Sequence, residues 1–212
     1  MKKKWIIILL IIGIIIVSVI LTGPVMSDVE IPKYKIIHAE KNIEIRSYDP
    51  MIIAEVKITG EREDAIGDGF QQLADYIFGN NSVQHNIAMS APVSQQVNQK
   101  IAMTAPVQQQ LNGFSWNISF IMPFKYNLER LPKPNNEKVV LREILSKQFA
   151  VIRFSGTNSD ENVKEHEEKL IKYLQAKKIT FSGSPKYAFY NPPWTLPSMR
   201  RNEMMFEIEQ KL

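Results

Sequence analysis

The amino-acid sequence predicts an α+β domain made of two similar βαββ units, whose strands form one antiparallel sheet with two helices packed on it. Three observations support this class: a long-range internal similarity, two segments with helical periodicity, and several segments with the alternation typical of strands. The sheet is expected to form a distorted barrel or a strongly curved sheet. One N-terminal transmembrane helix is expected to precede it.

The N-terminal segment contains an apolar run from Trp5 to Leu21, which follows three lysines. Such a run suits a short membrane span, and the lysines are expected to stay on the cytoplasmic side. A cleaved secretory signal is the alternative, because residues 25–27 suit a signal peptidase. We therefore divide the chain into a membrane anchor or signal, residues 1–27, and a domain, residues 28–212. The domain is expected outside the cytoplasm, tethered by a single pass through residues 5–21, or secreted or periplasmic after cleavage.

The charge of the domain is nearly balanced. Three of the 26 Lys and Arg residues lie at positions 2–4 and no acid precedes Asp28, so residues 28–212 hold 23 basic and 22 acidic side chains. No clustered basic face is evident, so we expect no nucleic-acid partner. Cysteine is absent, which excludes disulfides and thiolate chemistry.

An internal similarity relates two halves, about residues 34–123 and 137–210. Ile43–Gly60 and Val139–Gly156 match at a constant offset of 96, with arginine, alanine and glycine at equivalent places. Each block contains β-branched residues and ends at glycine, so each is read as a bent strand or a hairpin. A weaker match at an offset of 86 places residues 101–107 over residues 187–193.

Each block is followed by a segment with helical periodicity. Apolar side chains recur at helical spacing in residues 61–78 and again in residues 157–174, and acids near each start suit a helix N-terminus. In the second segment Asn158 or Ser159 is the expected N-cap. Each half is therefore predicted to contain one or more strands, then a helix, then two further strands.

The phrase I-A-M-[ST]-A-P-V occurs twice, at residues 87–93 and 101–107. Its apolar residues alternate with small ones, which predicts strands, and each proline is expected at an edge, a bulge or a strand end. The second phrase fills the place that the internal repeat requires, so the first is an inserted copy. It is read as a lengthened hairpin or as a contact for a partner.

Four motifs together resemble the SOUL family of heme-binding proteins, over about residues 34–208. They are Glu44-Ile-Arg46 with Tyr48 and Pro50, the helix A65-x-x-x-G69-F-x-x-L-x-x-Y-I-F-G-x-N81, K100-I-A-M-T-A-P-V107, and Y190-N-P-P-W194 followed by R200-R-N-E203. The resemblance implies a duplicated βαββ arrangement around a distorted barrel. It also implies non-covalent binding of heme or a related tetrapyrrole in an apolar cleft, with heme as a reversible ligand.

By this resemblance, the first helix and the loop before the last strand line the cleft. The implied ligand-binding residues are Ile66, Phe70, Leu73, Ile77, Tyr190, Trp194, Leu196, Arg200 and Arg201. The aromatic and aliphatic side chains would cover the porphyrin face, and the arginines would meet its propionates. For Ile66, Leu73 and Ile77 the alternative is ordinary helix-to-sheet core.

The sequence departs from the family at residues that contact heme in other members. Ser47 stands where some members have a histidine proposed as iron ligand, and Gly67, Asp75 and Thr195 replace basic types. His166 is therefore the one weak candidate for a metal ligand, with a hydrogen-bonded core histidine as the alternative.

Motifs of catalysis are absent: the chain has no G-x-S-x-G, P-loop, H-E-x-x-H or Gly-rich dinucleotide fingerprint. We therefore expect a binding protein and not an enzyme, acting in storage, buffering or transfer of heme. The alternatives are a binding module for other apolar small molecules and a surface interaction protein without heme. The physiological ligand, a protein partner and the oligomeric state are left open.

Overall fold

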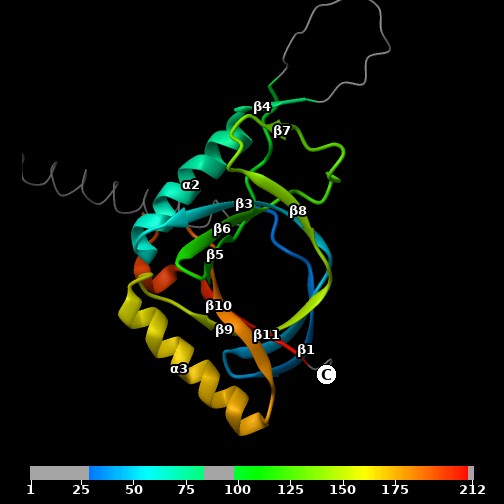
Figure 1. Cartoon of the computed structure of the whole chain (residues 1–212). Helices are drawn as coiled ribbons and strands as arrows, with labels where there is room; N and C mark the ends of the chain where they lie inside the picture. The colour runs from blue at the N-terminus through cyan, green and yellow to red at the C-terminus, as the bar shows by residue number, and fades with distance from the viewer. Residues whose placement is uncertain (1–28, 84–97, 210–212) are drawn as a thin grey trace, which may run out of the picture.

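The computed structural model of the chain describes residues 29–83 and 98–209, whose arrangement Figure 1 shows. The helices are α2 (Arg62–Phe78) and α3 (Asp160–Lys177), and a short 3-10 helix, η2 (Pro197–Met199), precedes the last strand. The strands are β1 (Tyr34–Glu40), β2 (Ile43–Tyr48), β3 (Met51–Thr59), β4 (Asn81–Ser82), β5 (Val107–Asn112), β6 (Ser115–Ile121), β7 (Lys133–Pro134), β8 (Val140–Ile144), β9 (Lys147–Phe154), β10 (Phe181–Phe189) and β11 (Asn202–Ile208).

The predicted α+β class, with two helices on a large antiparallel sheet, is confirmed. Nine strands form one curved sheet in the order β1-β2-β9-β11-β10-β5-β6-β3-β8, and β4 pairs separately with β7. The predicted closure into a barrel is wrong, because β1 and β8 end the sheet and do not pair with each other. The outermost strand, β1, is exposed except for half-buried Tyr34, so its outer edge faces solvent.

Strands of the two halves interlock across the sheet. Strand β2 pairs with β9 and strand β3 with β8, so each half contributes a strand next to the other half's strand. Each strand from β2 to β8 in this order has a counterpart in the other half. If every strand is replaced by its counterpart, the same order results, read from the opposite end. The alternative reading of residues 43–60 and 139–156 as hairpins is therefore wrong. Each block is a strand that bends and continues into another part of the sheet.

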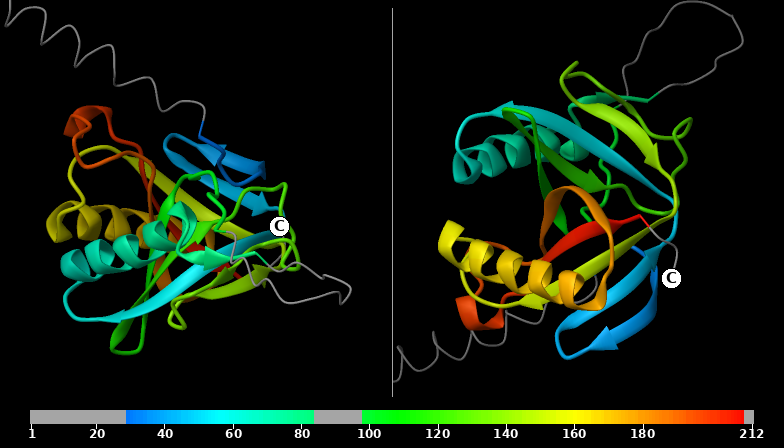
Figure 2. Two further views of the ribbon diagram at one scale, coloured as in Figure 1. Left: turned by 90° about the horizontal axis from the view of Figure 1, so that it is seen from above. Right: turned by 60° about the horizontal axis from the view of Figure 1, so that its bottom comes forward.

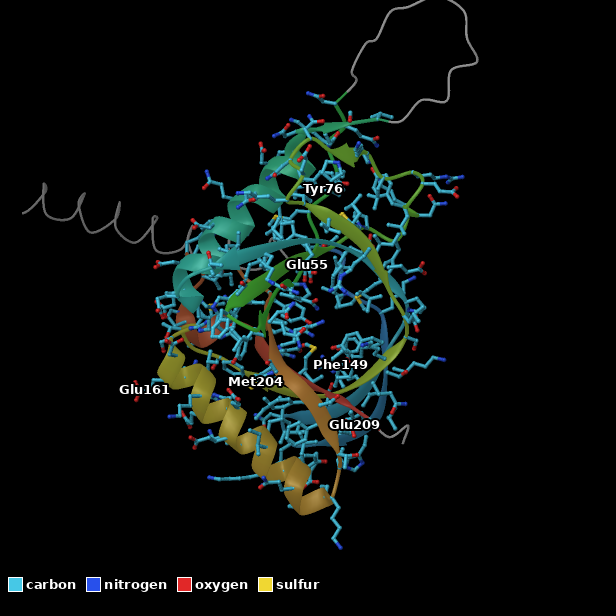
Figure 3. The ribbon with its side chains drawn as sticks, in the orientation of Figure 1. Glu55, Tyr76, Phe149, Glu161, Met204 and Glu209 are labelled. Atoms are coloured by element: carbon cyan, nitrogen blue, oxygen red, sulfur yellow. The ribbon has the colours of Figure 1, made fainter. Side chains whose placement is uncertain are left out.

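Both helices lie side by side on the same side of the sheet (Figure 2). Helix α2 packs on β3 and β6, where Leu73 and Ile77 join a core with Ile118 and Phe120. Helix α3 packs on β9 and β11, where Leu170 and other apolar side chains form a second core. A third, smaller cluster lies on the opposite face and includes Phe149, which Figure 3 shows inside the curve of the sheet.

Sequence signals explain where the helices begin and end. Ser159, one of the two residues predicted, occupies the N-cap position of α3 without a side-chain capping hydrogen bond, and acids lie in the first turn of both helices. Gly79 follows α2 with a positive φ of 125°, and its N–H reaches back to carbonyls of the last turn. A residue with a Cβ adopts this backbone conformation rarely, so the glycine stops the helix.

The second I-A-M-T-A-P-V phrase was predicted as a strand, and this is wrong for residues 101–106. The Ile101 N–H donates to the Ile77 carbonyl oxygen at 2.8 Å, and the Ala105 N–H donates to the Glu30 carbonyl oxygen at 3.0 Å. The backbone is thus bonded to α2 and to the N-terminal segment, and β5 begins only at Val107. The first phrase lies outside the described residues.

The predicted membrane location requires correction. In residues 29–83 and 98–209, neither helix has the length and apolar character needed to cross a membrane. The segment proposed as the membrane anchor, residues 5–21, lies outside the described part of the chain.

Two glycines of α2 lead to opposite predictions. A Cβ at Gly69 would lie 2.4 Å from Cγ1 of Ile118, whereas a Cβ at Gly67 would meet no atom within 4 Å. We expect Gly69→Ala to lower the free energy of unfolding by about 1–3 kcal/mol through overpacking. Gly67→Ala should raise it by up to about 1 kcal/mol, because alanine favours the helix. Urea unfolding followed by circular dichroism measures both, and equal effects of the two substitutions would contradict the packing described.

Candidate functional site

A buried ion pair joins two of the motifs found in the sequence. The Glu203 carboxylate on β11 is fully buried and accepts two hydrogen bonds from the Arg46 guanidinium on β2. Nη1 lies 2.8 Å from Oε2, and Nη2 lies 3.1 Å from Oε1. This bidentate geometry is the strongest form of an arginine–carboxylate contact. The two residues are 157 positions apart and come from strands separated by β9.

Further side chains complete the environment of Glu203. Arg201 donates to Oε1 from Nε at 3.0 Å and from Nη2 at 2.8 Å, while the Tyr190 hydroxyl donates to Oε2 at 2.9 Å. The Arg46 guanidinium also donates to the Tyr48 hydroxyl at 3.0 Å and lies over the Tyr34 ring at 4.3 Å. We call these six residues the Glu203 network.

The network fixes the charge state of its members. Burial alone would raise the pKa of Glu203, but hydrogen bonds and charges from Arg46 and Arg201 outweigh it and hold this pKa below its usual value. Burial also disfavours the charged form of Arg46, yet its contacts with Glu203 raise the Arg46 pKa. Burial raises the pKa of Tyr48 to about 12, so this hydroxyl stays protonated. At neutral pH the network is ionised, and its two guanidinium groups are balanced by Glu203 together with Glu44, whose Oε2 accepts from Arg46 Nε at 2.7 Å.

Both arginines predicted to meet heme propionates are engaged inside the protein. Arg201 pairs with Glu203 and stacks on Tyr190, with its guanidinium carbon 3.9 Å from the ring centroid. Arg200 donates from Nε to the Thr195 carbonyl oxygen at 2.7 Å and from Nη2 to the Pro193 carbonyl oxygen. Arg200 therefore holds the backbone of its own loop.

The loop between β10 and β11, residues 190–201, presents apolar side chains to solvent. Trp194 is 81% exposed, Leu196 51% and Met199 54%. The loop is fastened at several points, because the Gly156 N–H donates to the Pro197 carbonyl oxygen and the Arg201 N–H donates to the Asn191 side chain. A fixed loop with exposed apolar groups is typical of a binding surface.

The residues predicted on the first helix separate into two groups. Leu73 and Ile77 are fully buried beneath α2. They belong to the core between helix and sheet, which was the alternative prediction for them. Ile66 is half-buried, and Phe70 is 38% exposed with its ring edge against Phe120, 5.4 Å between centroids. In both views of Figure 2 the start of α3 lies between α2 and the β10–β11 loop. Among the described residues, no hydrogen bond or ring contact joins the predicted ligand-binding residues of α2 to those of the β10–β11 loop.

His166 is half-buried on α3 and lies parallel to the Phe154 ring, with centroids 4.2 Å apart. Its Nδ1 is 2.8 Å from the Asn162 carbonyl oxygen. A carbonyl can only accept, so Nδ1 carries the proton and Nε2 is the nitrogen left for a ligand. Metal-binding histidines commonly have this second hydrogen bond. Residues 29–83 and 98–209 contain no group of three or more His, Cys, Asp or Glu side chains that could hold a metal ion.

Sequence reasoning missed the Glu203 network, although its signal was present. Arg46 and Glu203 stand in two of the motifs that carry the resemblance, but the sequence does not show that the motifs meet. The partners of Arg46 and Arg201 become visible only once β2, β9 and β11 lie next to each other.

Comparisons with known proteins give one family and a shared fold. The model of a family described as SOUL heme-binding protein matches residues 29–207. The crystal structure of the EcmrR C-terminal domain has a TM-score of 0.57 at 9% identity, covering 84% of this chain and 99% of that chain. A hydrolase from Listeria innocua has a TM-score of 0.52 at 10% identity, covering 82% and 94%. At such identities the likeness shows the fold alone, and no curated protein matches this chain.

The buried carboxylate leads to a stability prediction. Glu203→Gln should lower the free energy of unfolding by about 3 kcal/mol, because it removes the buried carboxylate partner of Arg46 and Arg201 and leaves Arg46 only the half-buried Glu44. Glu207→Gln is the matched control, since Glu207 pairs with Lys147 at the surface and should change stability by less than about 1 kcal/mol. Urea unfolding at neutral pH gives both values, and similar losses in the two variants would refute the role of the network.

The same carboxylate leads to a prediction on pH. Because the pKa of Glu203 lies below its usual value in the folded state, its stabilising contribution is present above the unfolded-state pKa of about 4.3. The contribution is lost as the pH falls through the lower, folded-state pKa. The difference in unfolding free energy between the wild type and Glu203→Gln should therefore shrink on acidification below about pH 4. A difference that stays constant down to the acid transition would contradict this assignment.

Proposed function

Because this chain belongs to the SOUL heme-binding protein family, we propose that it binds heme or a related tetrapyrrole non-covalently and reversibly. Its role is that of a binding protein in storage, buffering or transfer, and not that of an enzyme. We further propose that residues 28–212 form one ligand-binding domain with halves of about 34–123 and 137–210. The strand order, which is the same from both ends when counterparts are exchanged, supports this division.

The observation that carries the proposal is the exposed apolar surface of the β10–β11 loop. Trp194, Leu196 and Met199 expose half or more of their area on a loop that Arg200 braces from within. A porphyrin has a large flat apolar face, and an exposed indole ring can stack on it with little loss of conformational freedom. Phe70 and Ile66 on α2 are further exposed or half-buried apolar residues that the family resemblance assigns to the ligand.

His166 is the candidate ligand of the iron. Its Nδ1–H is held by the Asn162 carbonyl, so Nε2 can coordinate without a change of tautomer. Its stacking on Phe154 fixes the plane of the ring. A heme ligated in this way would have an absorption band that depends on the imidazole.

A second candidate ligand class is an apolar molecule without acidic groups. Arg200 and Arg201 are bonded to carbonyl groups and to Glu203, so they are not free to pair with two propionates. This observation favours binding through apolar contacts. Heme binding of that kind should depend little on salt, because ion pairs with exposed propionates are the contacts that salt weakens.

Titration of hemin into the protein, followed by the Soret band, tests the proposal. Trp194→Ala should weaken binding by about tenfold through the loss of one aromatic contact. Phe114→Ala is the matched control, because Phe114 is fully exposed on the β5–β6 turn and lies outside the proposed surface. An equal effect of both substitutions, or no saturable shift in the wild type, would refute the proposed heme surface.

The iron ligand requires a separate titration. His166→Ala should leave hemin bound with a shifted Soret maximum if the imidazole coordinates the iron. His38→Ala is the control, since the His38 side chain is exposed on β1 and lies 4.0 Å from the Glu40 carboxylate. An unchanged spectrum in His166→Ala would show that His166 does not ligate the iron and is a core residue of α3.

A further inference from the structure

A pocket of about 430 Å³ lies where β3 begins, against the segment of residues 122–129 that follows β6. It is separate from the β10–β11 loop and contains none of the residues assigned to heme. Its volume lies in the range of small-molecule sites. The apolar part of its lining consists of Met51, Ile52, Met122, Phe124, Tyr126 and Leu128.

Hydrogen bonds to distant parts of the chain hold the pocket wall. The Met122 N–H donates to the Ile52 carbonyl oxygen at 2.8 Å, and the Phe124 N–H donates to the Glu30 carboxylate at 2.6 Å. Gln99 donates from Nε2 to the Tyr126 hydroxyl at 3.0 Å. The wall is therefore built in advance of any ligand, which lowers the entropic cost of binding.

The second I-A-M-T-A-P-V phrase supports this wall. The Thr104 hydroxyl donates to the Ile121 carbonyl oxygen, directly before the segment that forms the wall. Ile101 and Met103 pack in the same core as Met122 and Tyr126. A motif that the sequence singles out thus has a structural use next to the pocket.

The charged groups of the lining have one sign. Glu129 and Glu143 are its ionisable carboxylates, and among the described residues no lysine or arginine lines the pocket. Both acids are exposed, and neither carboxylate makes an ion pair or hydrogen bond with another described side chain. An anion would be repelled by these two carboxylates, whereas a cation would gain from both.

Two aromatic residues of the wall each contact a lysine that is not part of the pocket lining. The Lys33 ammonium lies over the Phe124 ring at 4.8 Å, and the Lys125 ammonium lies over the Tyr126 ring at 5.1 Å. One face of each ring is therefore already paired with a lysine of this chain, so these rings contribute apolar contact area to the pocket and not a free cation-binding face. The two methionines add an adaptable and polarisable surface for an apolar body.

We infer that this pocket binds a small amphipathic cation, a molecule with an aromatic or aliphatic body and a positively charged nitrogen. The body contacts the methionine and aromatic side chains, and the charge lies near Glu129 and Glu143 at the mouth. The inference is independent of heme binding, because the two surfaces share no residue.

Two fluorescent dyes of similar size and opposite charge test the inference. Thioflavin T is an aromatic cation, and 8-anilinonaphthalene-1-sulfonate is an aromatic anion. We expect saturable binding of thioflavin T by the full chain, weakened roughly tenfold in Glu129→Gln/Glu143→Gln through the loss of two charge contacts. Leu128→Lys, at a residue 42% exposed, should abolish binding by placing a cation in the pocket without disturbing the core.

The matched control is Glu161→Gln/Glu168→Gln, which removes the same charge from exposed residues of α3 (Glu161 is labelled in Figure 3). It should bind thioflavin T as the wild type does. Binding that is equal in all variants, absent from the wild type, or matched by the anionic dye at the same residues would overturn the inference. Unchanged hemin titrations in the pocket variants, and unchanged thioflavin T binding in Trp194→Ala, keep this result distinct from the outcome for the heme surface.

Discussion

The structure depends on one buried carboxylate, that of Glu203. Taking this charge out of water costs several kcal/mol, and only its hydrogen bonds to Arg46, Arg201 and Tyr190 offset that cost. The pairing is possible only when β2 and β11 are placed on either side of β9 in the observed register. A slip of one residue would turn Glu203 to the other face, among the apolar side chains beneath α3. The carboxylate therefore specifies the sheet as well as stabilising it.

The same network determines what the β10–β11 loop can offer a ligand. Tyr190 and Arg201, the first and last residues of this loop, both bond to Glu203, and Arg200 bonds to carbonyl groups within the loop. The polar groups of the loop are thus satisfied internally, and its apolar side chains remain at the surface. This arrangement favours a flat apolar ligand over one that needs strong ion pairs. The separate pocket beside β3 differs, since the charged groups of its lining are two carboxylates that pair with no other described side chain.

The interlocked sheet keeps these two surfaces apart. Because β2 pairs with β9 and β3 with β8, neither half has a complete sheet of its own, and the two helix-covered cores form together. The proposed heme surface lies on the loop between β10 and β11, while the pocket lies where β3 and β8 form one end of the sheet. One fold of two similar halves can thus present two different ligand surfaces.

Sequence by itself determined the local structure and the family. Apolar spacing in residues 61–78 and 157–174 predicted both helices, and the glycine after each strand block marked its end, because these signals depend on near neighbours in the chain. Tertiary structure alone decided which strands pair, that the sheet stays open, and that residues 101–106 support a wall instead of forming a strand. It also decided that Leu73 and Ile77 lie in the core and that Arg200 and Arg201 bond within the protein. Such outcomes depend on contacts between residues far apart in the chain, such as Arg46 and Glu203, whose meeting no local pattern encodes.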